Sequence, residues 1–106
     1  MSDQYFYNED IGQLIKEIPA DTIVSRTFFT REGLRAILFG FAPGQELSEH
    51  TASVPAIIHI LSGDARVTLG SDPYDSHPGA WAAMPPNMPH SIHANTQVIM
   101  LLIMLK

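Results

Sequence analysis

The chain contains no cysteine, which excludes both a disulfide framework and thiol catalysis. Its six basic residues are outnumbered by eleven acidic ones, and the basic residues form no cluster. We therefore expect no nucleic-acid partner, because such binding needs cations that neutralise phosphates. The longest apolar run, residues 98–105, is far shorter than the roughly 20 residues that a membrane-spanning helix requires. No membrane partner is expected either.

Common catalytic motifs are also missing. The sequence has no Gly-rich phosphate loop, no His-Glu-x-x-His helix and no nucleophile elbow. Ser91 directly follows His90, but neighbours on a strand face opposite ways, so they cannot form a nucleophile and base pair. The first ten residues lack the basic stretch and apolar run of a secretory signal, and we expect a cytoplasmic location.

What is present predicts one small all-β domain. A chain of 106 residues with 45% hydrophobic content can build one core, so residues 1–106 are interpreted as a single domain with a barrel at about 22–105. Apolar residues at helical spacing within 10–18 predict a short helix ended by Pro19. Residues 22–30 and 34–42 predict a hairpin. Later Gly, Pro and Asp turn signals divide the rest into short strands, as in a closed or sandwiched β fold.

Two of these β segments each carry a histidine between glycine and proline turns. The first runs from Gly44 to Gly63 and contains His50, and the second contains Gly79, Pro85 and His90. Together they resemble the paired motifs of the cupin superfamily. The resemblance implies a cupin jelly-roll barrel, also called a double-stranded β-helix, in which His50 and His90 occupy metal-ligand positions.

The motifs depart from the family pattern in ways that affect the site. Ala52 replaces the second histidine and Ala56 replaces the glutamate, so half of the usual ligand set is missing. Asn87 stands where the family has a glycine, and asparagine can still adopt a positive φ; Ala94 stands where the family has an asparagine. Catalytic transition-metal and zinc sites generally have three protein ligands and leave one position for water or substrate. We therefore expect at most weak binding of a divalent metal (Zn, Fe, Mn or Ni) by His50 and His90.

The alternation of side chains along a strand extends this prediction. In a cupin barrel, the inward-facing residues would be His50, Ala52, Ala56, Ile58, Ile60, His90, Ile92 and Ala94. The outward-facing ones would be Ile57, His59, Leu61, Ser91 and His93. His59 and His93 then cannot replace the lost ligands, and His77 is interpreted as a loop residue. Gln45, Glu46, Glu49 or Met84 could add an oxygen or thioether ligand, and a β-bulge would reverse the alternation.

Two strands are apolar on both faces, which bears on assembly. In residues 56–61 and 98–105, apolar side chains occupy both odd and even positions, whereas a strand with one hydrated face should alternate between apolar and polar residues. The outer face must be covered by a second copy of the chain or by the N-terminal segment. We expect a homodimer, as is common among small cupins.

The fold alone does not choose a function. The first hypothesis is a barrel that binds a small molecule through His50 and His90, with or without a divalent metal. The second is a small metal-dependent enzyme of the oxygenase or isomerase type. The third is a structural or interaction barrel without a ligand. Whether the chain is an enzyme stays open at this point.

Overall fold

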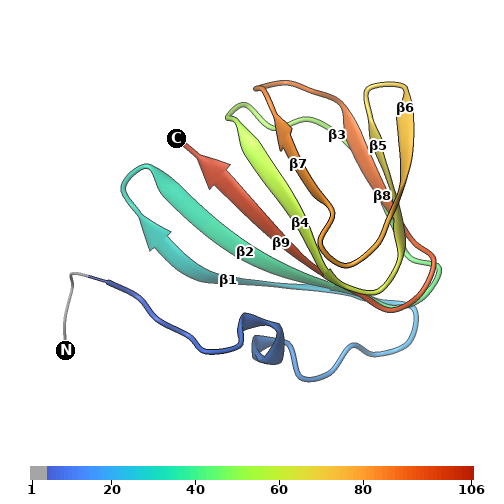
Figure 1. The fold of residues 1–106 in the computed structure, drawn as a ribbon, viewed down its shortest axis with the longest axis horizontal. Helices are drawn as coiled ribbons and strands as arrows, with labels where there is room; N and C mark the ends of the chain where they lie inside the picture. The colour runs from blue at the N-terminus through green and yellow to red at the C-terminus, as the bar shows by residue number, and fades with distance from the viewer. Residues whose placement is uncertain (1–4) are drawn as a thin grey trace.

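The computed structural model describes residues 5–106, which form two packed antiparallel β-sheets (Figure 1). In chain order the elements are a 3-10 helix, η1 (Ile11–Leu14), and nine strands: β1 (Ile23–Arg31), β2 (Leu34–Phe41), β3 (Glu46–His50), β4 (Ala56–Ser62), β5 (Ala65–Leu69), β6 (Asp72–Ser76), β7 (Trp81–Met84), β8 (His90–Ala94) and β9 (Val98–Leu105). The five-stranded sheet has the order β1-β2-β9-β4-β7, and the four-stranded sheet has the order β3-β8-β5-β6. The prediction of an all-β jelly roll is confirmed.

The core lies between the sheets, where alternate side chains of each strand meet. On β4, Ala56, Ile58 and Ile60 are buried, whereas Ile57, His59 and Leu61 between them are only partly buried. On β8, the residues at 90, 92 and 94 are buried and those at 91 and 93 are not. The inward and outward assignments made from the sequence for these two strands are therefore confirmed. The largest fully buried side chains of this core are Phe41, Ile58, Ile60, Ile92, Met100 and Val98. Leu38 is equally buried but lies on the outer face of the five-stranded sheet, in the row of Leu101 and His59.

The N-terminal helical segment is present but shorter than residues 10–18. Only Ile11–Leu14 is helical, and Ile15 already has extended backbone angles. The guanidinium of Arg26 donates a hydrogen bond to the Leu14 carbonyl at 3.2 Å, which satisfies the free end of this turn. Beyond it, Ile15 and Ile18 pack where a side chain at Gly40 of β2 would stand. Burial against the sheet thus replaces a second helical turn. No helix within residues 5–106 is long and apolar enough to cross a membrane.

At the flank formed by β6 and β7, which we call the unpaired flank, the two sheets are not joined by strand pairing. β7 is the last strand of the five-stranded sheet and β6 is the last strand of the four-stranded sheet, and the two do not pair with each other. Figure 1 shows the connection between them turning at the lower end of the barrel. That connection is fixed by two hydrogen bonds of 2.9 Å, from Gly79 N–H to the Ile60 carbonyl and from Ile60 N–H to the Ala80 carbonyl.

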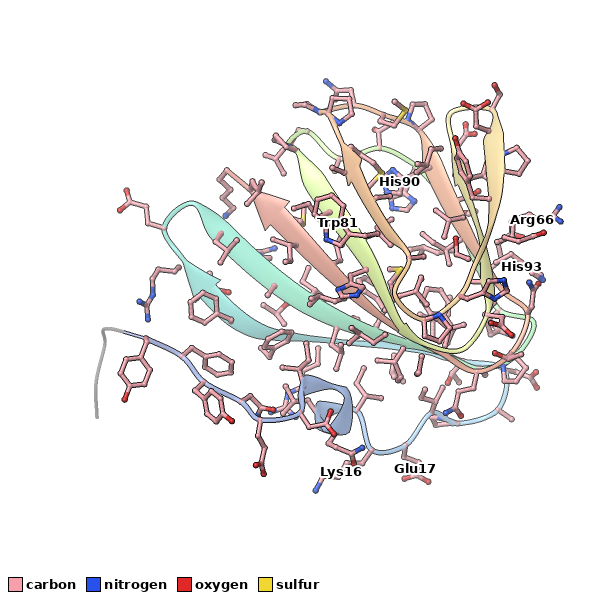
Figure 2. All side chains as sticks on the ribbon, in the orientation of Figure 1. Lys16, Glu17, Arg66, Trp81, His90 and His93 are labelled. Atoms are coloured by element: carbon pink, nitrogen blue, oxygen red, sulfur yellow. The ribbon has the colours of Figure 1, made fainter. Side chains whose placement is uncertain are left out.

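The opposite outer surfaces differ in chemistry. On the four-stranded sheet, one outward row crosses all strands and carries Glu46, His93, Arg66 and Asp75. Arg66 lies 3.4 Å from Asp75, and His93 lies 3.2 Å from Glu46. Figure 2 shows Arg66 and His93 directed away from the barrel interior. We call these four residues the charged row. The outer face of the five-stranded sheet is instead mostly apolar, with Ile57 and Ile103 beside His59 and Leu101.

Candidate functional site

The structure brings the two motif histidines together. His50 on β3 and His90 on β8 are directly paired in the four-stranded sheet. Their ring centroids lie 4.1 Å apart, and the ring planes are inclined by 58°. Figure 2 shows His90 projecting into the space between the sheets. The convergence expected from the motif spacing is therefore present in the fold.

A β-bulge is what turns His50 toward its partner. Leu47 pairs with Ile92, and the next pair in the ladder is His50 with His90, so β3 has one more residue than β8 over this interval. Strict alternation from the inward-facing Leu47 would place His50 on the outer face. The extra residue reverses the alternation, as bulges near functional sites commonly do.

Backbone carbonyl groups hold both imidazoles in the same way. Nδ1 of His50 lies 2.8 Å from the Ser48 carbonyl oxygen, and Nδ1 of His90 lies 2.9 Å from the Met88 carbonyl oxygen. A carbonyl oxygen only accepts, so each Nδ1 must carry the proton and donate it. In the neutral ring, Nε2 then has a free lone pair. The pair can accept two hydrogen bonds from a ligand or ligate a metal, which is the arrangement typical of metal-binding histidines.

The pair lies at the rim of the barrel. His90 is only 5% exposed, whereas His50 is exposed to solvent. Next to them, the loops of the two motifs are joined by a 2.7 Å hydrogen bond from Asn87 N–H to the Ala52 carbonyl. Asn87 has φ +67°, so it adopts the positive φ expected for the position of the family's glycine. We refer to this end of the barrel as the mouth.

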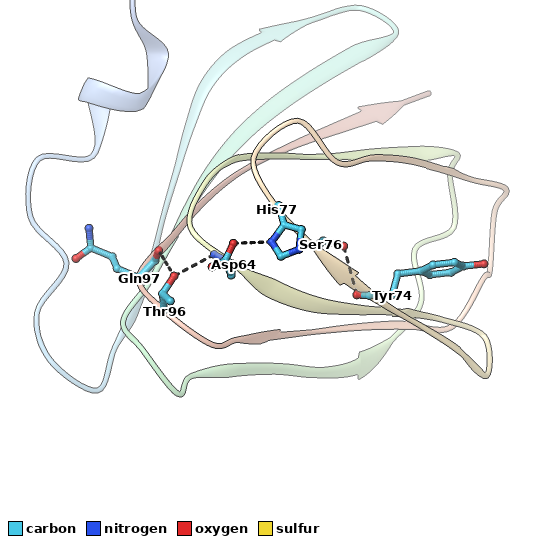
Figure 3. Close-up of polar contacts among 6 residues, drawn as sticks. All are labelled: Asp64, Tyr74, Ser76, His77, Thr96 and Gln97. Carbon is cyan, nitrogen blue, oxygen red and sulfur yellow. Dashed lines mark hydrogen bonds and ion pairs between the residues drawn. The ribbon is translucent and has the colours of Figure 1, made fainter.

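The other histidines lie away from this pair. His93 contacts Glu46 in the charged row, and His59 is paired with Trp81 on the outward face of the five-stranded sheet. His77 is in the loop after β6, where its Nδ1 lies 2.7 Å from an Asp64 carboxylate oxygen (Figure 3). These positions agree with structural roles. Because Glu46 contacts His93 on the outer face, it does not supply the oxygen ligand considered from the sequence.

A cavity of about 400 Å³ lies between the sheets at the unpaired flank. Its deep wall is formed by Ile58 and Ile60 from β4 and by Val67 and Leu69 from β5, and neither His50 nor His90 lines it. Leu69 is directly paired with His90, so the cavity begins one strand away from the histidines. Sequence reasoning did not locate this space. The small residues Ala80 and Ala82 facing the cavity were the available signal.

Comparison with known proteins places this geometry in a family. Residues 37–105, which include both histidine motifs, match the family described as the cupin domain. The chain belongs to the cupin family. A comparison with curated proteins finds no match.

Solved structures of other proteins have the same architecture as this cupin. A cupin superfamily protein from Desulfitobacterium hafniense is 25% identical, with a TM-score of 0.84 and 93% of each chain covered. A conserved protein of unknown function from Streptococcus pyogenes is 31% identical, with a TM-score of 0.83, covering 97% of this chain and 90% of that one. Salicylate 1,2-dioxygenase from Pseudoaminobacter salicylatoxidans, crystallised with gentisate adducts, is 16% identical, with a TM-score of 0.75, covering 81% of this chain and 26% of that one. The dioxygenase likeness concerns the fold alone.

The residues of this cupin do not fit the full metal site of the family. Ala56, at the position of the family's glutamate, is 3% exposed and is flanked in the sheet by Met84 and Met104. Ala52 has no ligating side chain. Among residues 5–106, no group of three or more His, Asp or Glu side chains is placed to hold a metal ion. Two imidazoles are the available donors, and they bring no negative charge to balance a cation.

Proposed function

We propose that this cupin binds a small molecule at the mouth of its barrel and contacts it through His50 and His90. The proposal rests on the 4.1 Å approach of the two rings, each held through Nδ1 so that Nε2 is free. Two neutral imidazoles in this state accept hydrogen bonds, so the ligand presents hydroxyl, amine or amide donors to them. A few convergent polar groups in a mostly apolar surrounding are typical of ligand sites.

The unequal burial of the two rings supports a site open to exchange. His90 is anchored in the packed region beside Met88, while His50 is accessible from solvent. A ligand resting on both rings therefore has one face against the barrel wall and reaches the site without a rearrangement of the strands. This matches a binding or sensing role, in which the ligand is not sealed from water.

A second candidate function is that of a small metal-dependent enzyme of the oxygenase or isomerase type. The observation in its favour is that both rings are held through Nδ1, which in the neutral ring leaves Nε2 as the kind of nitrogen donor that Zn, Fe, Mn or Ni binds. His50 and His90 would hold such a metal only together with water or ligand oxygens. The metal would supply Lewis-acid chemistry at the mouth, and the two alanines argue against it.

One set of measurements separates these functions. The protein is purified without a nickel column, analysed for metal, and screened by thermal shift against carboxylates, sugars and divalent ions. A compound that binds only the folded state raises the melting temperature as its concentration exceeds its dissociation constant. We expect metal-free protein and a stabilising ligand whose effect disappears in His50→Ala and His90→Ala but persists in the outward-facing control His93→Ala.

Other outcomes have definite meanings. Stoichiometric iron, manganese, zinc or nickel that is lost in His50→Ala would support the enzyme. A ligand effect that survives in both mouth variants would reject the histidine site. Protein that contains no metal and binds no compound in the screen would support the third hypothesis, a structural or interaction barrel without a ligand.

We further propose that two copies of the chain associate through the outer face of the five-stranded sheet. On this face, Ile57, Leu101 and Ile103 are only partly buried, and Trp81 at the sheet edge is 61% exposed. The N-terminal segment covers the β1–β2 side, where Phe6 packs on Phe28 and Phe29 and Ile18 packs at Gly40. It thus accounts for part of the apolar surface, and a second copy covers the rest. The four-stranded sheet, with its charged row, is the hydrated face.

A further inference from the structure

We propose that the cavity between β4, β5, β6 and β7 is a second binding site, independent of the histidine pair, for a small neutral aromatic molecule that enters between the edge strands β6 and β7. The lining includes residues from all four strands but neither His50 nor His90. Leu69, paired with His90, forms the boundary between the cavity and the mouth. The two sites therefore have different walls and different polar groups.

The size and wall of the cavity favour an apolar ring system. Ile58, Ile60, Val67 and Leu69 form the hydrocarbon floor of a space of about 400 Å³ that opens to solvent, and the first three are closely packed, at 2%, 1% and 4% exposed. An apolar cavity of roughly 150 Å³ is sufficient for benzene. The cavity therefore has room for a bicyclic ring. Burying such a ring is favourable because it removes apolar surface from water.

The charge and the hydrogen-bonding groups of the lining favour a neutral ligand with one polar substituent. Among the residues that line the cavity, Asp75 and the Tyr74 phenol are the ionisable groups. The Asp75 carboxylate already contacts Arg66 at 3.4 Å. Ser76 faces inward on β6 and is 8% exposed. Its hydroxyl donates a long 3.3 Å hydrogen bond to the Tyr74 carbonyl (Figure 3), which leaves the oxygen lone pairs free to accept from a ligand hydroxyl or N–H.

The entrance lies at the unpaired flank. Tyr74 on β6 and Trp81 on β7 both belong to the cavity lining, yet they are 53% and 61% exposed. The cavity therefore reaches solvent between these strands. Tyr74 pairs with the inward-facing Val67, so its exposed ring provides a surface at this opening on which an aromatic ligand stacks. At its lower end the cavity is bounded by the β6–β7 connection, in which Gly79 and Ala80 are hydrogen-bonded to the backbone of Ile60.

The experiment uses 2-naphthol, a neutral bicyclic phenol, and methyl NMR of the full chain labelled at isoleucine and valine. We expect saturable shifts at Ile58, Ile60 and Val67 and none at the outward-facing Ile57. Ala82 pairs with Ile58 and faces the cavity, whereas Ala83 pairs with Ile57 and faces outward. Ala82→Ile fills the site and should weaken binding at least about tenfold. The matched variant Ala83→Ile should bind like the native chain.

Two further variants complete the test. Ser76→Ala should weaken 2-naphthol binding roughly two- to tenfold, the size of one net hydrogen bond. The double variant His50→Ala with His90→Ala should leave it unchanged, which separates this site from the mouth. If Ala82→Ile gives the spectrum of an unfolded chain, Val67→Ile reduces the same space from the opposite wall. Non-saturating shifts, shifts centred on Ile57, equal binding by the filled and control variants, or loss of binding in the double histidine variant would each overturn the proposal.

Discussion

The ring of His50 lies 4.1 Å from that of His90, centroid to centroid, although the two residues are 40 positions apart in the chain. A direct pairing between β3 and β8 sets this distance, and a bulge after Leu47 sets the direction of His50. The same bond from Nδ1 to the carbonyl two residues earlier fixes both rings. The rings differ in burial, and their contributions to stability should differ accordingly.

Replacing the buried ring should cost more stability than replacing the exposed one. His90→Ala removes a packed side chain and leaves the Met88 carbonyl without its donor, so we expect a loss of about 2 kcal/mol. His50→Ala changes an exposed position and should cost less than about 0.5 kcal/mol. Urea unfolding of the two variants, analysed for the midpoint and the slope of each transition, measures the difference in their free energies of unfolding. Equal losses would contradict the burial of the two rings.

The turn between β4 and β5 should tolerate no side chain. Gly63 has φ +83°, and a Cβ atom there would overlap the Gln97 carbonyl oxygen. Gly33 has φ +87° but open space around it, so Gly33→Ala is a matched control. We expect Gly33→Ala to lower the free energy of unfolding by about 1–2 kcal/mol, from backbone strain alone. Gly63→Ala should cost about 2 kcal/mol beyond that, because the backbone of the β8–β9 loop must move. Thermal unfolding of both variants distinguishes the two effects.

Asn87 should behave as a substitute for glycine. Its φ of +67° strains most residues but not glycine, so Asn87→Gly should be neutral within about 0.5 kcal/mol. Asn87→Ala should lose about 1 kcal/mol, because alanine pays the full cost of the left-handed conformation. Both variants keep the N–H that bonds to the Ala52 carbonyl. A large loss in the glycine variant would show that the asparagine side chain, not the backbone, is what matters.

Restoring the missing ligands should create a metal site. The double change Ala52→His with Ala56→Glu returns the residues that the family motif has at these positions. Ala56 is buried, so without metal the new carboxylate should lower the free energy of unfolding by about 3 kcal/mol. Added Zn²⁺ or Mn²⁺ should recover roughly 2.7 kcal/mol at 100 times the dissociation constant. The native chain is the control, and calorimetric titration is the readout. A variant that still binds no metal would show that the rings are not oriented for ligation.

The proposed association can be disrupted from one sheet and not from the other. Ile57 faces outward on the five-stranded sheet, and Thr68 faces outward on the four-stranded sheet, paired with Ser91. Ile57→Glu places a charge in an apolar contact and should convert a dimer into a monomer, whereas Thr68→Glu should leave the dimer intact. Light scattering at micromolar concentration gives the mass. A native chain that is already monomeric would remove the dimer.

The sequence was most informative where alternation along a strand coincided with a motif. It predicted the buried faces of β4 and β8 and the hairpin β1–β2, because strand period and turn residues are local properties. It overestimated the N-terminal helix, since Ile15 and Ile18 gain more by packing at Gly40 than by continuing the turn. Helical spacing alone does not report such a tertiary contact.

The site itself was only partly predictable. The motifs identified His50 and His90, but alternation gives the face of a side chain and not its depth, so the exposure of His50 came from the structure. The bulge before His50 is visible only in the pairing of β3 with β8. The cavity depends on where the two sheets end, at β6 and β7, and no local pattern specifies that separation.

The unpaired flank at β6 and β7 leaves two strand edges without backbone partners, which in other proteins act as templates for polymerisation. Here β6 contains Pro73, which has no N–H to offer, together with Asp72 and Asp75, and β7 has four residues and stops at Pro85. Proline, charge and short length each discourage an intruding strand. The chain can thus keep a lateral opening into its interior while resisting growth into fibres.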